Sequence, residues 1–285
     1  MNRKVITEKI VFGLFRLCMI SLVAIVLSLL GHITMNGLPV LSLDFILKPP
    51  EGGMMGGGIS SAIAGTIMLM LLTVVFAIPL GVGAAIFLSE YTENVDPRLI
   101  RVIRMAINNL AGVPSIVYGL LGLGLFVLFL RLRFSILSAA LTLSFLTLPV
   151  IIATSEEALR SVPRSYREAS LALGATKWET IRNVVLPTAF PGILTACILG
   201  LSRAAGETAP LLMTGAAYYL PRFSGNIFRQ FMALSTHIFF MATQSPNPEL
   251  TRPIQYGTIT VLLLLVLTMN MAAILLRSHY RRKLS

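Results

Sequence analysis

Long apolar runs constrain this chain more than any other feature of its sequence. Six of them, at residues 11–32, 61–88, 112–130, 134–155, 188–213 and 256–276, consist almost entirely of apolar residues. About 20 such residues suffice for a helix to cross the hydrocarbon core of a bilayer. A transmembrane β-barrel would show segments of about ten residues with alternating hydrophobicity instead. The sequence therefore predicts an all-α, polytopic membrane protein with about six transmembrane helices.

The composition agrees with a membrane location. Of the 285 residues, 55% are hydrophobic and only 12% are charged, whereas about a quarter of the residues of soluble domains are charged. The net charge of +11 would also suit a nucleic-acid-binding protein. However, membrane proteins concentrate Lys and Arg in their cytoplasmic loops, and this bias explains the charge without nucleic acid. We expect one transmembrane domain over residues 1–285, with both termini cytoplasmic.

The remaining segments divide into linkers and one short apolar stretch. Residues 227–243 are apolar but short, and they contain Arg229 and His237. As a seventh span they would place the basic C-terminal tail outside, against the positive-inside rule. We predict an interfacial or re-entrant helix there. Residues 33–60, rich in glycine and proline, are predicted to be a flexible loop, and residues 89–108 a polar link.

Residues 156–187 interrupt the apolar pattern with five Lys or Arg and four Glu residues. Residues 166–173 suit a short helix, and Gly174 can take the left-handed conformation that ends a helix. Thr176 is then an N-cap, and Glu179, three residues later, completes a capping box. We expect a helix–turn–helix whose second helix runs to about residue 186.

The same segment carries a spaced pattern of residues. It reads Glu168-Ala169-Ser170, three residues, Gly174, nine residues, Val184, one residue, and Leu186-Pro187. Pro187 would open the next apolar segment as a first-turn proline. The pattern resembles the EAA signature of ABC-importer permease subunits, from which Ser170 and Val184 depart conservatively. An amphipathic loop without a partner is the alternative.

The resemblance implies a type I ABC importer permease fold. In that family the loop is a cytoplasmic helix–turn–helix that docks into a groove on an ATPase subunit. The residues that the resemblance assigns to ATPase coupling are Glu168, Ala169, Ser170, Gly174, Leu186 and Pro187. The chain itself contains no P-loop, so we expect no cofactor on it and ATP hydrolysis, with ATP and Mg, on a separate subunit.

Two ionisable residues, Arg203 and Glu207, lie deep in the fifth apolar run. A charged residue at the centre of a membrane helix costs about 2.5–3.5 kcal/mol on translocon scales. The two residues are four apart, so they share one face of a helix. They either neutralise each other and lock helices together, or form a site on a substrate path. The planar, permanently charged fork of Arg suits an oxyanion, phosphate above all.

Two hydroxyl residues are weaker candidates for the substrate path. Ser115 stands near the predicted start of the third helix, where free backbone N–H groups favour an anion, although a simple helix entry and kink is the preferred explanation. Thr66 either lines the path or packs. The histidines, His32, His237 and His279, show no metal-ligand spacing, and we expect no metal site.

Three motifs narrow the resemblance to the phosphate branch of these importers. Arg203-Ala-Ala-Gly-Glu207-Thr-Ala-Pro210 resembles the fifth-helix signature of PstA-type permease subunits. Residues 111–119, AGVPSIVYG, and residues 60–66, SSAIAGT, are similar to other parts of the same family. The resemblance covers essentially the whole chain in order and length.

The resemblance implies the partners and the location as well. These are a PstC-type sister permease, a PstB-type ATPase dimer and a PstS-type periplasmic phosphate-binding protein, at the bacterial inner membrane. It further implies phosphate import by alternating access, with no bond of the substrate broken by this chain. An importer of another oxyanion, such as sulfate or molybdate, remains an alternative. An intramembrane enzyme using Glu207 is a remote one, because no second carboxylate or nucleophile–base pair lies at similar depth.

Overall fold

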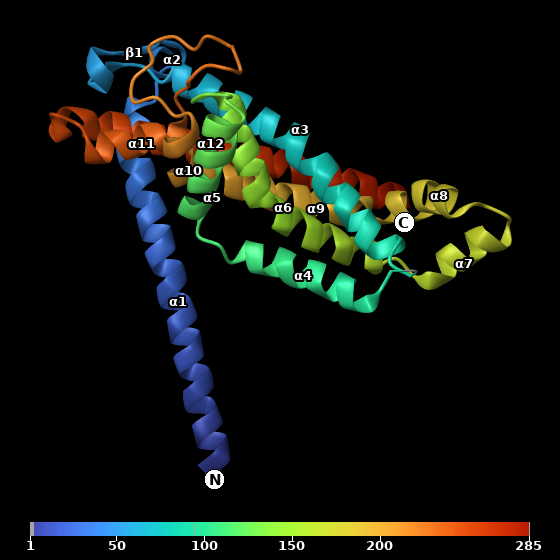
Figure 1. Ribbon diagram of the computed structural model, residues 1–285. Coiled ribbons are helices and arrows are strands. Elements are labelled where there is room, and N and C mark those ends of the chain that lie inside the picture. The colour runs from blue at the N-terminus through green and yellow to red at the C-terminus, as the bar shows by residue number, and fades with distance from the viewer. Residues whose placement is uncertain (1–2, 94, 285) are drawn as a thin grey trace.

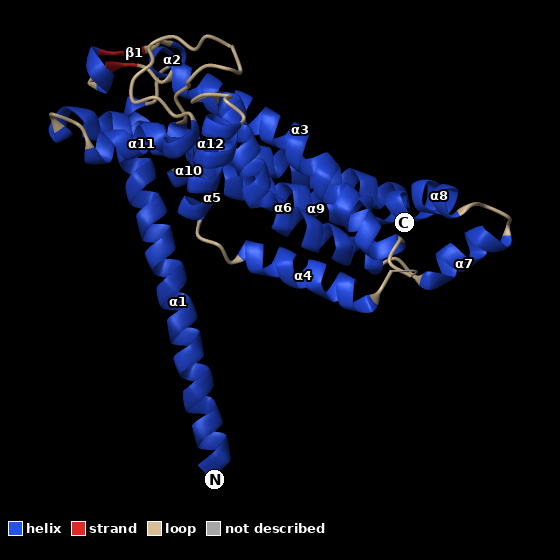
Figure 2. Ribbon diagram, viewed as in Figure 1, coloured by secondary structure: helices blue, strands red, loops and turns tan. Residues whose placement is uncertain are grey.

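The computed structural model describes residues 3–93 and 95–284. The predicted all-α architecture is confirmed, because helices form most of the described chain (Figure 2). Five helices are long and apolar enough to cross a membrane, and a sixth span is added when one bent pair of helices is counted as one. This agrees with the prediction of about six spans.

Four long helices form the body of the molecule. They are α3 (Ser60–Glu90), α6 (Ile136–Arg160), α9 (Leu186–Gly206) and α12 (Pro248–Leu284). Small residues let α6 approach its neighbours: a Cβ atom added to Gly81 of α3 or to Gly200 of α9 would lie within 2.8 Å of the Ile151 side chain. Such residues allow the close backbone contact on which helix association in membranes depends.

The first helix, α1 (Arg3–Gly37), extends away from this body (Figure 1). Its most apolar 18-residue window is fully exposed. Only its last turns contact the rest of the chain, where His32 Nε2 lies 3.2 Å from the Tyr256 hydroxyl of α12. The helix therefore presents its apolar surface outward.

The third predicted span differs from the prediction. The supposed polar link ends in a helix, α4 (Pro97–Ala111), which is bent by 103° relative to the segment Ser115–Phe129. That segment consists of α5 (Ser115–Gly122) and a π-helical continuation, η3 (Leu123–Phe129). Because the two together are about 22 Å long at 1.5 Å per residue, they cannot cross the ~30 Å hydrocarbon core alone. Asp96 caps α4 by accepting a hydrogen bond from the Arg98 N–H at 2.8 Å.

Residues 33–60 fold into a compact end structure, so the prediction of a flexible loop is wrong. It contains η1 (Leu38–Val40), α2 (Leu43–Leu47), η2 (Gly52–Met54) and an antiparallel pair of β1 (Pro50–Glu51) and β2 (Gly56–Gly57). Phe45 and Met54 anchor it, because both are buried in a cluster with Ile59 and Met232. Burial of these side chains stabilises the segment, and this could not be predicted from its glycine-rich composition.

The predicted re-entrant segment 227–243 is helical only in its second half, α11 (Leu234–Thr243). The residues before it form a turn and then a short non-helical stretch, in which the Ala217 N–H donates to the Phe231 carbonyl at 2.7 Å. Phe231, Leu234 and His237 are all almost fully buried. With ten residues α11 is too short to span a bilayer, and it packs inside the protein.

Candidate functional site: a coupling loop and a broken membrane helix

The loop between α6 and α9 lies at the end of the body opposite the β1–β2 pair (Figure 1). Its first arm is α7 (Arg164–Ala172), close to the predicted range. Gly174 has φ +85°, the left-handed conformation predicted for the turn. The Thr176 N–H donates to Glu179 Oε2 at 2.8 Å, and the Glu179 N–H donates to Thr176 Oγ1 at 3.3 Å. The predicted turn and capping box are therefore confirmed.

The second arm does not end at residue 186 as predicted. It begins as α8 (Lys177–Thr180), widens into a π-helical turn, η4 (Ile181–Val185), and continues without a break into α9. Pro187 therefore lies inside a continuous helix. Proline lacks an N–H and crowds the preceding turn, and the wider π turn accommodates both effects. Any movement of the second arm is passed directly to α9.

The predicted coupling residues divide between the tip and the base of this loop. Glu168, Ala169 and Gly174 are exposed near the tip, whereas Leu186 is half-buried in α9. Ser170 connects the two arms, because its hydroxyl lies 2.9 Å from the Thr180 hydroxyl.

Large apolar side chains are also exposed on the loop. Leu173 is 89% exposed, and Tyr166, Leu171 and Trp178 are each about half exposed. An exposed apolar patch at the end of a polar loop is typical of a protein-interaction site.

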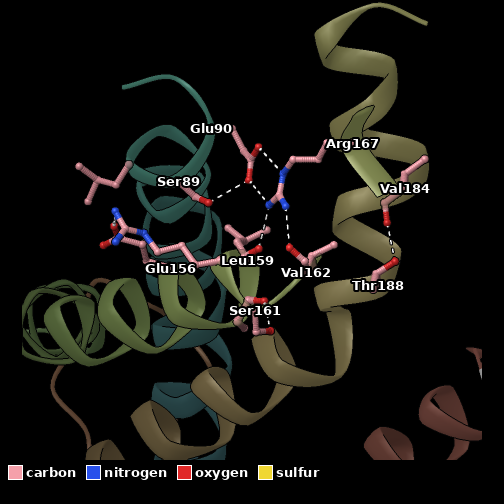
Figure 3. Close-up of polar contacts among 12 residues, drawn as sticks. Ser89, Glu90, Glu156, Leu159, Ser161, Val162, Arg167, Val184 and Thr188 are labelled. Atoms are coloured by element: carbon pink, nitrogen blue, oxygen red, sulfur yellow. Dashed lines mark hydrogen bonds and ion pairs between the residues drawn. The ribbon is translucent and has the colours of Figure 1, made fainter. Parts of the chain in front are cut away.

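An ion pair that the sequence did not reveal attaches the loop to the helix body (Figure 3). Arg167 of α7 donates to both carboxylate oxygens of Glu90, at 2.8 and 3.1 Å. It also donates to the carbonyls of Val162 at 2.7 Å and of Leu159 at 2.9 Å. Glu90 is the last residue of α3, and Ser89 donates a further hydrogen bond to its carboxylate at 2.8 Å.

The second charged feature lies at a break in the fifth span. The helix α9 ends at Gly206, Glu207 is extended (φ −68°, ψ 136°), and a short helix, α10 (Ala209–Thr214), follows. The prediction of one continuous helix to residue 213, with Arg203 and Glu207 on one helical face, is therefore wrong. Pro210 contributes to the break, because it has no N–H to donate to the Gly206 carbonyl, although Pro79, Pro149 and Pro191 lie inside continuous helices.

Arg203 and Glu207 nevertheless form a pair across the end of α9. Arg203 Nε lies 3.8 Å from Glu207 Oε1, and the two side chains are 39% and 15% exposed. The distance is too long for a hydrogen bond, so the attraction is electrostatic only. The Glu207 backbone is fixed separately, because its carbonyl accepts a hydrogen bond from the Ser235 hydroxyl of α11 at 2.8 Å.

The two hydroxyl candidates occupy different positions around this break. Ser115 is half-buried in the first turn of α5, and α5 packs on α10 so closely that a Cβ atom on Gly119 would lie 3.0 Å from Pro210 Cα. Thr66 is 3% exposed; its hydroxyl donates to the Ala62 carbonyl at 2.7 Å and accepts from the Leu234 N–H at 2.9 Å. In this conformation Thr66 holds the start of α11.

The described residues contain no group of three or more His, Cys, Asp or Glu that could bind a metal ion. Burial lowers the pKa of His237 to about 4, so this imidazole is neutral and belongs to the packed interior.

Known proteins are similar to this chain in sequence and in fold. The chain is 37% identical over 297 residues to "Probable ABC transporter permease protein YqgI" of Bacillus subtilis, covering 100% of this chain and 99% of the relative. It is 39% identical over 199 residues to "Phosphate transport system permease protein PstA" of Xylella fastidiosa, covering 70% and 68% of the two chains. These relatives confirm the resemblance to PstA-type permeases.

The fold comparison and the family model extend this result. A bacterial alginate ABC transporter, solved with its pentasaccharide-bound periplasmic protein, matches 99% of this chain and 97% of its own at a TM-score of 0.65 and 14% identity. The predicted type I ABC importer permease fold is thereby confirmed. The model of the "binding-protein-dependent transport system inner membrane component" family matches residues 77–285. The chain therefore belongs to this family of multi-pass inner-membrane permeases of ABC importers.

Proposed function

We propose that this chain is the PstA-type permease subunit of an ATP-driven importer of inorganic phosphate. The observation that carries the proposal is the state of Arg203 at the helix break. Its side chain is 39% exposed and held only loosely by Glu207. A guanidinium has five N–H donors in a fork that matches phosphate oxygens, and a 3.8 Å contact leaves that fork available.

The names of the relatives support phosphate as the substrate, but the shared fold does not identify the substrate. The name of the Xylella fastidiosa relative specifies phosphate transport, whereas the name of the Bacillus subtilis relative gives no substrate. The alginate transporter shares the fold at 14% identity and carries another substrate. Selectivity therefore depends on residues of the path rather than on the architecture. Arg203 is our candidate for attracting phosphate, Glu207 for holding Arg203 when no anion is present, and Ser115 for a contact at the start of α5.

We further propose the assembly that the family requires. A PstC-type sister permease completes the path, a PstB-type ATPase dimer binds ATP and Mg, and a PstS-type periplasmic protein delivers phosphate. The exposed tip of the loop around Gly174 is the proposed ATPase contact, so this end of the body faces the cytoplasm. The C-terminus lies at the same end, since Phe190 near the start of α9 makes an edge-to-face contact with Tyr280 at 4.9 Å between ring centroids. The N-terminus follows if α1 crosses the membrane once.

The test is ATP-dependent uptake by the purified, reconstituted complex, with phosphate, sulfate and molybdate compared in parallel. We expect phosphate-selective uptake that stops when ATP is withheld. Selective uptake of sulfate or molybdate would replace phosphate and retain the importer. A fully assembled complex that moves none of the three anions would contradict the proposed function. The matched variant is Arg203→Lys, which keeps the charge but loses the fork.

A further inference from the structure

In the described part of the chain, two ion pairs of different exposure join the coupling loop to α3 and the turn after it, beside the apolar cluster that contains Ala85 of α3 and Val162 of the loop. The first is the Arg167–Glu90 pair, in which the side chains are only 20% and 7% exposed. The second joins Lys177 of α8 to Glu93, at 2.7 Å, and its side chains are 44% and 80% exposed. The first contact joins an arm of the loop to the last residue of α3 and the second to Glu93 in the turn that follows, and only the first is largely withdrawn from solvent.

The burial decides which contact can transmit force. A bidentate bond between Arg and a carboxylate fixes both distance and orientation, and two further N–H groups of Arg167 donate to the Leu159 and Val162 carbonyls. Removing one partner of such a buried pair leaves a charge without compensation and is strongly unfavourable. An exposed Lys–Glu contact, in contrast, contributes little because solvent competes for both groups.

We propose that Arg167 and Glu90 form a rigid link that makes α3 move together with the coupling loop during the transport cycle. The loop reaches α9 through the continuous chain, because α8 runs into α9. The loop reaches α3 through contacts in space, because Glu90 at the end of α3 precedes Arg167 by 77 positions. Among the ionic contacts, the Arg167–Glu90 pair is the one largely withdrawn from solvent. The inference rests on the proposed role of the loop in ATPase coupling and assigns positioning roles to two residues outside the EAA pattern.

The movement of α3 has a route to the helix break. The Thr66 hydroxyl of α3 accepts a hydrogen bond from the Leu234 N–H at 2.9 Å. The next residue, Ser235, donates to the Glu207 carbonyl at 2.8 Å. A shift of α3 is thereby passed to the segment that carries Glu207, the partner of Arg203. Loop, α3, start of α11 and helix break form a connected series of direct contacts.

The first test compares Glu90→Gln and Arg167→Lys with wild type in the complete complex. Three quantities are measured: co-purification of the ATPase, ATP hydrolysis, and phosphate uptake. We expect the ATPase to co-purify and to hydrolyse ATP within about twofold of wild type, because the tip of the loop is unchanged. Uptake per ATP should fall at least about tenfold, since a buried ion pair is weakened. Uptake per ATP at the wild-type level in both variants overturns the proposal.

The matched control uses the exposed contact between the same segments. Lys177→Gln and Glu93→Gln should each leave uptake per ATP within about twofold of wild type. An equal loss in these controls would also contradict the proposal, because it would show that burial of the contact does not matter. Failure of the wild-type complex to transport any anion is a separate result, which rejects the proposed function. Uncoupling is measured only against a wild-type complex that transports.

A second measurement needs no change in the ion pair. Spin labels are placed at Phe87→Cys on α3 and Ser165→Cys on α7, both exposed, in a chain whose Cys18 and Cys197 are replaced by Ser. The distance between the labels is measured in the assembled complex with and without ATP. A constant distance is expected for a rigid link. A change comparable to one helical turn, about 5.4 Å, would show that α3 and the loop move separately and would overturn the proposal. This result does not depend on whether the Glu90→Gln and Arg167→Lys variants fold.

Discussion

The two arginine–glutamate pairs of this chain differ in geometry and exposure. Arg167 donates to Glu90 at 2.8 and 3.1 Å and to two backbone carbonyls, so four of the five N–H donors of its guanidinium are used. Arg203 lies 3.8 Å from Glu207, and its side chain is 39% exposed. Identical residue types are therefore held differently, and this difference underlies the two proposals: that the pair at the coupling loop fixes a position, and that Arg203 at the helix break keeps its donors for an anion.

The largest effect is expected at the coupling loop, from Gly174→Asp. No atom lies within 4 Å of the place a side chain would occupy there, so we expect the protein to insert normally. The new charge projects from the tip, where it prevents ATPase docking, and φ +85° adds strain of about 1–2 kcal/mol for a residue with a side chain. ATP-dependent phosphate uptake should be abolished. Normal uptake together with normal co-purification of the ATPase would show that the tip is not the docking site.

The next largest effect is on stability, and it should differ between the two arginine–glutamate pairs. Glu90→Ala leaves the partly buried Arg167, whose side chain is 20% exposed, without its carboxylate partner, so we expect the free energy of unfolding to fall by about 1–3 kcal/mol. The matched variant Glu207→Ala should cost much less, because Arg203 is partly exposed and its contact is long. Thermal unfolding of the purified complex in detergent measures both. Equal losses of unfolding free energy would show that the closely hydrogen-bonded pair and the loose pair do not differ in their contribution to stability.

The sequence predicted the coupling loop well because its determinants are local. Gly174 ends a helix by its own backbone freedom, and Thr176 and Glu179 cap the next one across three residues. The partner of Arg167 could not be found this way, since Glu90 precedes it by 77 positions and lies at the end of an apolar run. A single sequence shows which residues are charged, but the fold decides which of them meet.

The helix break was missed for a different reason. Pro210 follows Gly206 by four residues, and this spacing removes a helical hydrogen bond wherever it occurs. The signal was therefore present, although the apolar run concealed it. The helix α4 was missed similarly: Asp96-Pro97 is an N-cap followed by a first-turn proline, but its arginines favoured a polar link. The compact fold of residues 33–60 depends on burial of Phe45 and Met54 against distant residues, which no local pattern reveals.

A moderate effect is expected at the helix break from Arg203→Gln. The substitution removes a permanent charge from the proposed path, whereas the contact it breaks is only electrostatic. Phosphate uptake should fall about tenfold, which corresponds to about 1.4 kcal/mol, with assembly and ATPase co-purification unchanged. Reconstituted uptake measures this directly. Wild-type uptake would mean that Arg203 and Glu207 only pack. A loss of assembly would mean that this pair, like Arg167 and Glu90, stabilises the structure.

The smallest effect is expected for Ser170→Ala, which restores the alanine of the EAA signature. The Ser170 hydroxyl lies 2.9 Å from the Thr180 hydroxyl and connects the two arms, while Thr180 is 4% exposed. Losing one such hydrogen bond costs about 0.5–1.5 kcal/mol. Arg167 still holds the first arm and the chain still joins the second to α9, so uptake should stay within about twofold of wild type. A large loss of uptake would show that the contact between the arms, and not the buried ion pair, makes the loop rigid. The same assays on Thr180→Val, which removes the hydroxyl from the other side, decide between these explanations: two equally small effects are expected if the ion pair dominates.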